Sequence, residues 1–96
     1  MNRDVVGYVY AALEGPNYAA LRGPAGVVHD LFVQTEYRKA GLGEALLRAA
    51  VQQLERMGAP QIVLSTAHEN DAAQRLFARI GFRPSMVEMT LSIGGA

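Results

Sequence analysis

The residues best suited to chemistry form a loop with two glycines, Arg38-Lys39-Ala40-Gly41-Leu42-Gly43. The loop follows an apolar run at residues 27–33 and opens a long amphipathic segment. Glycines let the backbone turn tightly and remove side chains that would block a ligand. The first N–H groups of a helix have no partner inside it, and the helix dipole favours negative charge there. A strand, a glycine loop and a helix start together predict a site for a phosphate ester or a pyrophosphate.

Two common phosphate-binding motifs do not fit this loop. A P-loop requires Lys and then Ser or Thr after its last glycine, whereas Gly43 is followed by Glu44-Ala45. A dinucleotide-binding fingerprint requires a third glycine, and Leu46 occupies that position. It also requires an acidic residue at the end of the next strand, which here ends in Leu64-Ser65-Thr66. The glycine loop alone therefore leaves the class of site open.

His29 is the side chain best suited to proton transfer. It lies four residues before Val33, and strand alternation places it on the same face as Val27, Leu31 and Val33, with Asp30 on the opposite face. An imidazole titrates near neutral pH, which suits a general base. The alternative is a structural histidine whose ring is hydrogen-bonded at a strand end.

The pattern of apolar residues predicts the elements that hold these side chains. Residues 5–13, 18–22 and 26–33 have the composition of strands, and Glu14-Gly15-Pro16-Asn17 has that of a turn. The connections are too short for crossovers, so we expect an antiparallel meander.

After the glycine loop, apolar residues recur with the spacing of one face of a helix. The helix is predicted to begin at Leu42 and to end at Gly58, which suits a C′ position, because Pro60 blocks continuation. A short apolar strand follows at residues 61–66. A helical connection allows this strand to lie parallel to the strand at residues 26–33.

A second helix and a last strand complete the prediction. Asn70 is a favourable N-cap, and Gly81 ends the helix that follows it. Residues 87–93 then alternate strictly between apolar and polar side chains, which predicts a half-buried strand.

Composition narrows the classes of protein. The 96 residues allow one domain, residues 1–96, and half of them are hydrophobic. Nine basic residues balance nine acidic ones, so we expect neither nucleic acid nor an anionic membrane as a partner. The absence of cysteine excludes disulfides, thiolate metal sites and thiol nucleophiles. Apolar runs are shorter than a membrane span, and Asn2-Arg3-Asp4 does not suit a signal peptide, so a cytoplasmic location is expected.

Two motifs in order resemble one family. The first is R-x-x-G-x-G between a strand and a helix, at Arg38, Gly41 and Gly43. The second is N-x-x-A-x-x-L-Y/F-x-x-x-G-F, carried by a helix that starts at Asn70 and ends at Gly81-Phe82. Together they resemble the acetyl-coenzyme A signature of the GNAT superfamily of N-acetyltransferases, and the resemblance runs from about residue 5 to residue 93.

The resemblance implies an α/β fold with a GNAT-like mixed sheet. An antiparallel meander would lead into a β-α-β-α-β unit whose central parallel strands, 26–33 and 61–66, splay apart around acetyl-CoA. The backbone of residues 31–33 would pair with the pantetheine arm, and the N–H groups of residues 38–44 would hold the pyrophosphate. The cofactor-binding residues implied in this way are Leu31, Phe32, Val33, Arg38, Lys39, Ala40, Gly41, Leu42, Gly43, Glu44, Asn70, Ala73 and Phe77.

The implied activity is transfer of an acetyl group from acetyl-CoA, a cosubstrate, to a primary amine of a small molecule or peptide, without a metal. The N–H of Val33 would stabilise the thioester oxygen, and His29 would act as base. Many family members carry Tyr where Phe77 stands, and Phe has no proton to give. Glu88, on the outward face of the last predicted strand, is a weak candidate for binding a cationic acceptor, although a solvated strand face explains it equally well.

The family usually begins with one more strand and two helices, which form much of the acceptor site and are missing here. Three explanations stay open: a fragment, a mis-set start, or a short form that borrows surface from a partner. A short sheet leaves an edge and apolar surface exposed, so we expect a homodimer. Two other functions stay open: a non-catalytic acyl-CoA-binding domain, regulatory or degenerate, and a structural dimerisation module without affinity for the cofactor.

Overall fold

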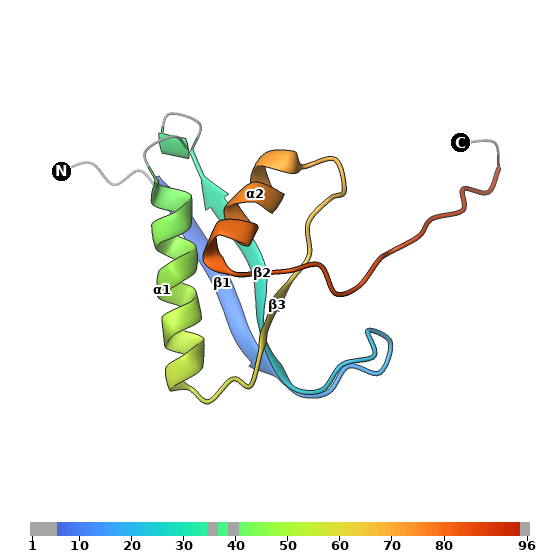
Figure 1. The fold of residues 1–96 in the computed structure, drawn as a ribbon, viewed down its shortest axis with the longest axis horizontal. Helices are drawn as coiled ribbons and strands as arrows, with labels where there is room; N and C mark the ends of the chain where they lie inside the picture. The colour runs from blue at the N-terminus through green and yellow to red at the C-terminus, as the bar shows by residue number, and fades with distance from the viewer. Residues whose placement is uncertain (1–5, 35–36, 39–40, 95–96) are drawn as a thin grey trace.

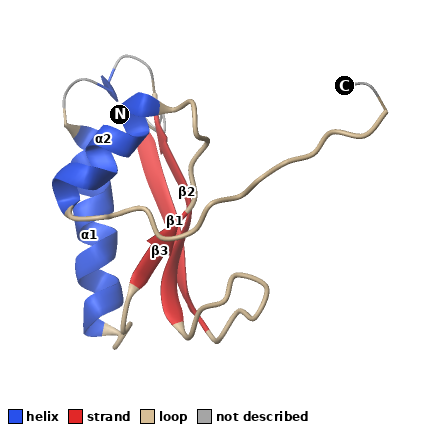
Figure 2. Ribbon diagram, turned by 45° about the vertical axis from the view of Figure 1, so that its right-hand side comes forward, coloured by secondary structure: helices blue, strands red, loops and turns tan. Residues whose placement is uncertain are grey.

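The computed structural model describes residues 6–34, 37–38 and 41–94, which form a two-layer α/β fold. The elements follow one another as β1 (Gly7–Glu14), β2 (Ala25–Val33), α1 (Leu42–Arg56), β3 (Ile62–Leu64) and α2 (Asp71–Ile80). Both helices lie on the same face of the sheet (Figures 1 and 2). This arrangement confirms the predicted mixed α/β architecture.

The sheet has the order β1-β2-β3. β1 and β2 are antiparallel, whereas β2 and β3 are parallel and are joined through α1, as predicted. The parallel pairing is short, because it covers only Gly26 to Val28 of β2 against the three residues of β3. Most of β2 therefore has a strand beside it on one edge only.

The core lies between α1 and the first two strands. Val28 and Val33 of β2 are buried against the apolar stripe of α1, where Leu47 and Leu54 are the buried residues. A Cβ atom at Gly26 would lie 2.9 Å from a methyl carbon of Leu54, so the missing side chain lets helix and strand approach closely. The glycine at this position of β2 therefore serves packing.

Local capping explains where the helices end. Asn70 caps α2, because its Oδ1 accepts a hydrogen bond from the N–H of Ala73 at 3.1 Å. Gly81 ends α2 with φ +116°, and Gly58 follows the last turn of α1 with φ +91°, conformations that glycine adopts without strain. The predicted positions of both helices are confirmed.

The predicted strand at residues 18–22 is wrong, because this segment is a turn. Asn17 and Arg22 exchange two backbone hydrogen bonds, of 2.9 and 3.1 Å, and the chain reverses between them. The side chain of Asn17 also accepts from the N–H of Ala20, and Leu21 has φ +53°. Bonds from an Asn side chain to nearby backbone favour turns, and here they outweigh the strand propensity of the segment. The segment belongs to the loop that joins β1 directly to β2.

The predicted strand at residues 87–93 is also wrong. Residues 83–94 contain no helix or strand, and the segment extends away from the body of the molecule (Figure 1). Its apolar side chains, at Val87, Met89, Leu91 and Ile93, are 80–88% exposed. The radius of gyration is 15.3 Å, whereas a compact chain of this length would have about 12.5 Å. Alternation supplies the two faces of a strand, but a strand also requires an edge with which to pair.

None of the described helices could cross a membrane; the longer one, α1, has 15 residues.

Candidate functional site

The candidate site is the opening where β2 and β3 separate. Their pairing ends at Val28 and Leu64, but β2 continues to Val33. α2 lies beside the opening, and a hollow of about 240 Å³ remains between the three elements. The hollow is lined by Val28, His29, Asp30, Leu31, Leu64, Ser65, Asn70, Ala73, Leu76 and Phe77. The second sequence motif, carried by α2, thus borders the hollow together with β2 and the end of β3.

The backbone of β2 offers free groups along this opening. The N–H of Gln34 donates to the carbonyl of Val6 on the β1 side at 2.8 Å. Because successive residues of an antiparallel strand turn their N–H and C=O groups to alternate edges, those of Val33 and Leu31 face away from β1. The carbonyl of Val33 accepts a hydrogen bond from Nε of Arg38 at 2.9 Å. The Arg38 side chain therefore secures the end of the open edge, a role that the sequence did not indicate.

The start of α1 provides a second set of free donors. Gly41 occupies the N-cap position with φ +81° and makes no side-chain capping bond. The first helical bond runs from the N–H of Ala45 to the carbonyl of Gly41, at 3.1 Å. The N–H groups of Leu42, Gly43 and Glu44 therefore have no partner within the helix. Lys39 and Ala40, also predicted to bind the cofactor, lie outside the described residues.

Gly43 links the start of α1 to the opening between the strands. A Cβ atom there would lie 3.6 Å from Cγ2 of Val33 and 3.8 Å from Cδ2 of Leu76, which are ordinary contacts. Gly43 therefore faces the end of β2 and the neighbouring side of α2. The glycine loop and the opening form one continuous region.

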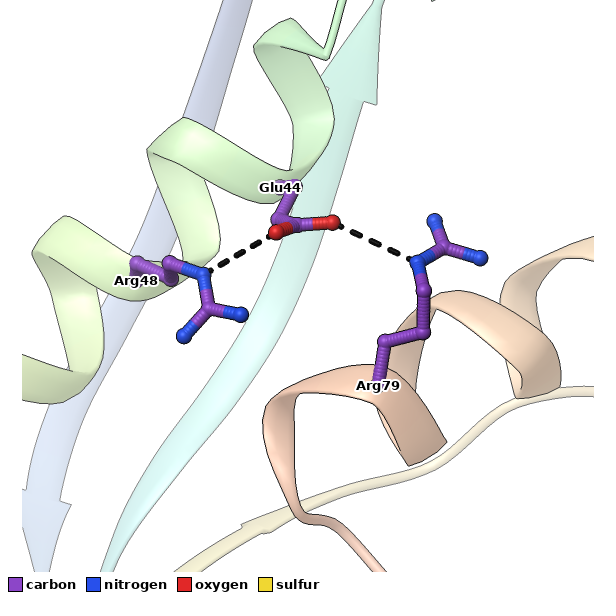
Figure 3. Close-up of polar contacts among 3 residues, drawn as sticks. All are labelled: Glu44, Arg48 and Arg79. Carbon is purple, nitrogen blue, oxygen red and sulfur yellow. Dashed lines mark hydrogen bonds and ion pairs between the residues drawn. The ribbon is translucent and has the colours of Figure 1, made fainter.

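Glu44 stands at the centre of an ion-pair cluster beside this region (Figure 3). Its carboxylate accepts from Nε of Arg48 at 3.1 Å and from Nε of Arg79 at 3.4 Å. The hydrogen bond from Arg48 is the main cause that holds the pKa of Glu44 below its usual value, and Arg79 acts in the same direction. The cluster joins α1 to α2 and offsets a negative charge near the predicted anion site.

The α2 side of the hollow is largely apolar. Asn70 uses its Oδ1 for the helix cap, and Ala73 and Phe77 follow on the side of α2 that lines the hollow. The ring of Phe77 packs against Phe82, with a centroid distance of 6.1 Å. Leu64, Ser65 and Leu76 also line the hollow and were not among the predicted site residues.

His29 occupies a bulge in β2. The register places Tyr10 opposite Asp30 and Ala11 opposite Val28, so His29 has no partner residue in β1. His29 was predicted to share a face of the strand with Leu31 and Val33, because side chains alternate along a regular strand. The extra residue of the bulge interrupts this alternation. Its Nε2 atom is in hydrogen-bond contact with the carboxylate of Glu14, and its ring lies 5.6 Å from that of Tyr10. The bulge immediately follows Val28, where β2 and β3 separate.

Asp30 has a partner in β1 as well. Its carboxylate accepts a hydrogen bond of 2.6 Å from the hydroxyl of Tyr8, and this bond is the main cause that raises the pKa of Tyr8. Tyr8, Tyr10 and Glu14 were not predicted to lie near the site. Their positions two and four residues apart on the strand that pairs with β2 are the signal that could have identified them.

The structure does not bring Glu88 to the site. Glu88 was expected on the outward face of a last strand, but it lies in the extended segment that leaves the body of the molecule (Figure 1). The remaining predicted residues that the structure describes lie along the opening, at its β2 edge or at the start of α1.

Comparisons with known proteins agree with this geometry. The model of the Acetyltransferase (GNAT) family matches residues 1–82. The chain is 38% identical over 74 residues to the mycothiol acetyltransferase of Thermobispora bispora. The matched segment covers 77% of this chain and 23% of that relative. The chain thus spans about a quarter of that protein's length.

Solved structures show the same fold. A putative acetyl transferase from Pyrococcus furiosus superposes with a TM-score of 0.82 at 24% identity, covering 94% of this chain and 58% of that one. Aminoglycoside N-acetyltransferase AAC(6')-Iy in complex with CoA superposes with a TM-score of 0.79 at 19% identity, covering 96% and 70%. With the family match over residues 1–82, these findings lead to one conclusion: the chain belongs to the acetyltransferase (GNAT) family.

Proposed function

We propose that this chain binds acetyl-CoA in the opening between β2 and β3 and transfers its acetyl group to a primary amine of a small molecule or peptide. The observation that carries the proposal is the separation of the two parallel strands beside the uncapped start of α1. Free backbone groups on a strand edge suit an extended, amide-containing arm, and free N–H groups at a helix start suit a pyrophosphate. Both occur here along one continuous region.

In this proposal each part of acetyl-CoA meets a distinct part of the site. The N–H groups of residues 42–44 hold the pyrophosphate, with Gly41 providing the backbone turn. The N–H and C=O groups of Leu31 pair with the pantetheine arm, and the N–H of Val33 is left for the thioester. Asn70, Ala73 and Phe77 form the opposite wall beside the thioester.

Acetyl transfer then requires a neutral amine, and a free alkyl amine has a pKa of about 10. The amine nitrogen attacks the thioester carbonyl carbon, the new C–N bond forms, and the C–S bond breaks with its electron pair moving to sulfur. His29 accepts the proton that the amine nitrogen loses. The N–H of Val33 stabilises the charge that develops on the carbonyl oxygen. A proton from water restores the thiol of CoA, because Phe77 has none to give.

An amine acceptor is supported by the name of one structural neighbour. The aminoglycoside N-acetyltransferase is named for the transfer of an acetyl group to nitrogen, and its structure contains CoA. The mycothiol acetyltransferase supports the acetyl group as the transferred unit.

The test is release of free CoA by the purified chain supplied with acetyl-CoA and a panel of amines. The panel contains small polyamines, amino sugars and peptides with free N-termini. We expect release above the rate of spontaneous hydrolysis with at least one class of amine. If acetyl-CoA binds but no amine promotes release, the transfer step of the proposal is wrong.

A non-catalytic acyl-CoA-binding domain is the second candidate, and one observation favours it. Phe77 occupies the position where many family members carry a tyrosine, and its ring packs against Phe82 beside the hollow. This function predicts binding of acetyl-CoA without release of CoA, so the same assay separates the two candidates.

A further inference from the structure

The side chain of Asp30 lies on the face of the sheet that points away from the helices. Val33 is buried on the helix-covered face, and alternation along β2 places Asp30 on the opposite one. Asp30 stands directly opposite Tyr10 in the register with β1. Its carboxylate accepts a hydrogen bond of 2.6 Å from the hydroxyl of Tyr8. Asp30 therefore has one tyrosine opposite it and a second tyrosine bonded to it.

The negative charge of Asp30 has no positive partner in the part of the chain that the structure describes. β1 and β2 contain two carboxylates, Glu14 and Asp30, and neither lysine nor arginine. Glu14 contacts His29, whereas the ion pairs of the described residues do not include Asp30. The hydrogen bond to Asp30 is the main cause that raises the pKa of Tyr8, so this hydroxyl remains a neutral donor. It holds the carboxylate in place without cancelling its charge.

Tyr10 connects Asp30 to His29. Its ring centroid lies 5.6 Å from that of His29, and its Cα is paired with that of Asp30. A protonated amine is attracted to the face of a tyrosine ring within about 6 Å of the ring centroid. His29 and Asp30 also both line the hollow between β2, β3 and α2. One short molecule can therefore place one nitrogen at His29 and a second, charged nitrogen beside Asp30 and Tyr10.

We propose that Asp30, with Tyr8 and Tyr10, binds a second positive charge of the acceptor, so that the acceptor is a diamine or another amine with a neighbouring cation. The inference rests on the proposed function, in which His29 meets the reacting nitrogen. Tyr8 orients the carboxylate, and Tyr10 provides an aromatic surface for the same cation. The uncompensated charge of Asp30 thereby acquires a partner.

The two nitrogens of such an acceptor have different roles. The reacting nitrogen loses its proton to His29 as it attacks the thioester, whereas the second nitrogen stays protonated and pairs with the carboxylate of Asp30. This pair fixes the acceptor at both ends and so orients the reacting nitrogen. A monoamine of the same length lacks the second contact, so it should bind more weakly.

The first test measures binding of the acceptor without transfer. The isotope-labelled full chain, with CoA present, is titrated with putrescine, a four-carbon diamine, and with butylamine, the monoamine of the same length. The amide resonances of Tyr10 and Asp30 report the affinity. We expect putrescine to bind at least about tenfold more tightly than butylamine, and Asp30→Asn to remove this difference. Equal affinities in the wild type, or a difference that persists in Asp30→Asn, would overturn the proposal.

A matched substitution controls for the loss of charge. Glu55→Gln removes one carboxylate from the last turn of α1, on the helix side of the sheet, and should keep the preference for putrescine. If Asp30 only joined β2 to β1, Asp30→Asn would lower the affinities for both amines equally, and this result would count against the proposal.

Tyr8→Phe provides a second variant, because it keeps the ring and the charge of Asp30 but removes the hydroxyl that orients the carboxylate. Circular dichroism checks the fold of each variant. We expect Tyr8→Phe to have a preference for putrescine between those of the wild type and Asp30→Asn. If Asp30→Asn does not fold, an unchanged preference in Tyr8→Phe would overturn the proposal.

Release of CoA from acetyl-CoA separates this inference from the proposed function. If putrescine binds through Asp30 but neither amine promotes release, the transfer step is wrong and the cation site stands. If both amines are acetylated with equal kcat/KM, the transfer step stands and the role of Asp30 is wrong. We expect release with both amines and a higher kcat/KM for putrescine, which Asp30→Asn lowers to that for butylamine.

Discussion

At the scale of single residues, His29 has a defined environment before any substrate is bound. The bulge directs its ring toward Glu14 and Tyr10 on β1, while its own position on β2 borders the hollow. A carboxylate in contact with one imidazole nitrogen fixes the orientation of the ring. This leaves the other nitrogen available for a proton from an acceptor amine. The role of base that we propose requires this ring to reach the acceptor amine from the β1 side of β2.

Replacement of His29 tests this role. We expect His29→Ala to lower the maximal rate of acetyl transfer by roughly 10²-fold, the low end for loss of a general base. The affinity for acetyl-CoA should change little, because the loop and the β2 backbone provide that binding. The acid limb of the pH–rate profile should disappear, because it reports the protonation of the base. Steady-state kinetics across pH measures all three quantities.

The other histidine offers a control for this experiment. His68→Ala removes the same ring from a position in the loop before Asn70, and it should leave the profile unchanged. A wild-type rate in His29→Ala would show that His29 is structural. A joint loss of rate and cofactor affinity would show that it shapes the pocket.

At the scale of elements, α2 lies beside α1 and forms one wall of the opening. α2 has no fully buried residue, so its packing contributes less than that of α1. The ion pair of Glu44 with Arg79 connects the two helices where the cofactor is proposed to pass, whereas Arg48 pairs with Glu44 within α1. These groups are exposed, and exposed ion pairs contribute little stability. Their role is therefore to orient α2 and to offset the charge of Glu44 near the helix start.

The start of α1 is tested by a glycine substitution. Gly41 has φ +81°, and an added Cβ would meet nothing within 4 Å, so Gly41→Val strains the backbone without a clash. We expect the altered turn to misdirect the free N–H groups and to weaken acetyl-CoA binding at least tenfold, about 1.4 kcal/mol. Calorimetric titration with acetyl-CoA measures this change.

Gly58 provides a matched control at the other end of the same helix. It has φ +91°, and nothing lies within 4 Å of an added Cβ, so Gly58→Val imposes a comparable strain far from the loop. Both variants should lose a similar amount of stability, about 1–2 kcal/mol, but Gly58→Val should bind acetyl-CoA as the wild type does. Equal affinities in the two variants would contradict the assignment of the loop.

At the scale of the whole molecule, the features predicted correctly from sequence depend on local signals. The start of α1 at the glycine loop, the cap at Asn70 and the stop at Gly81 are each encoded within a few residues. The parallel arrangement of β2 and β3 followed from the helical connection between them. The two motifs then identified which ends of these elements border one site.

The features that were missed depend on pairing between distant segments. The bulge at His29 appears only when β2 is aligned with β1, and the contact with Glu14 depends on it. Residues 87–93 were predicted as a strand because apolar and polar side chains alternate within the segment itself. A strand also needs a neighbouring strand with which to pair, and that neighbour depends on the assembled fold. Residues 18–22 were mispredicted because the side chain of Asn17 stabilises a turn there.

The central claim is that acetyl-CoA occupies the opening between β2 and β3. Titration of the isotope-labelled chain with acetyl-CoA, followed through its backbone amide resonances, tests this claim most directly. We predict saturable shifts at the amides of Leu31, Val33 and residues 42–44, and little change at Ile62, where β3 still pairs with β2. Absence of saturable shifts, or shifts confined to Ile62 and its neighbours, would contradict the account.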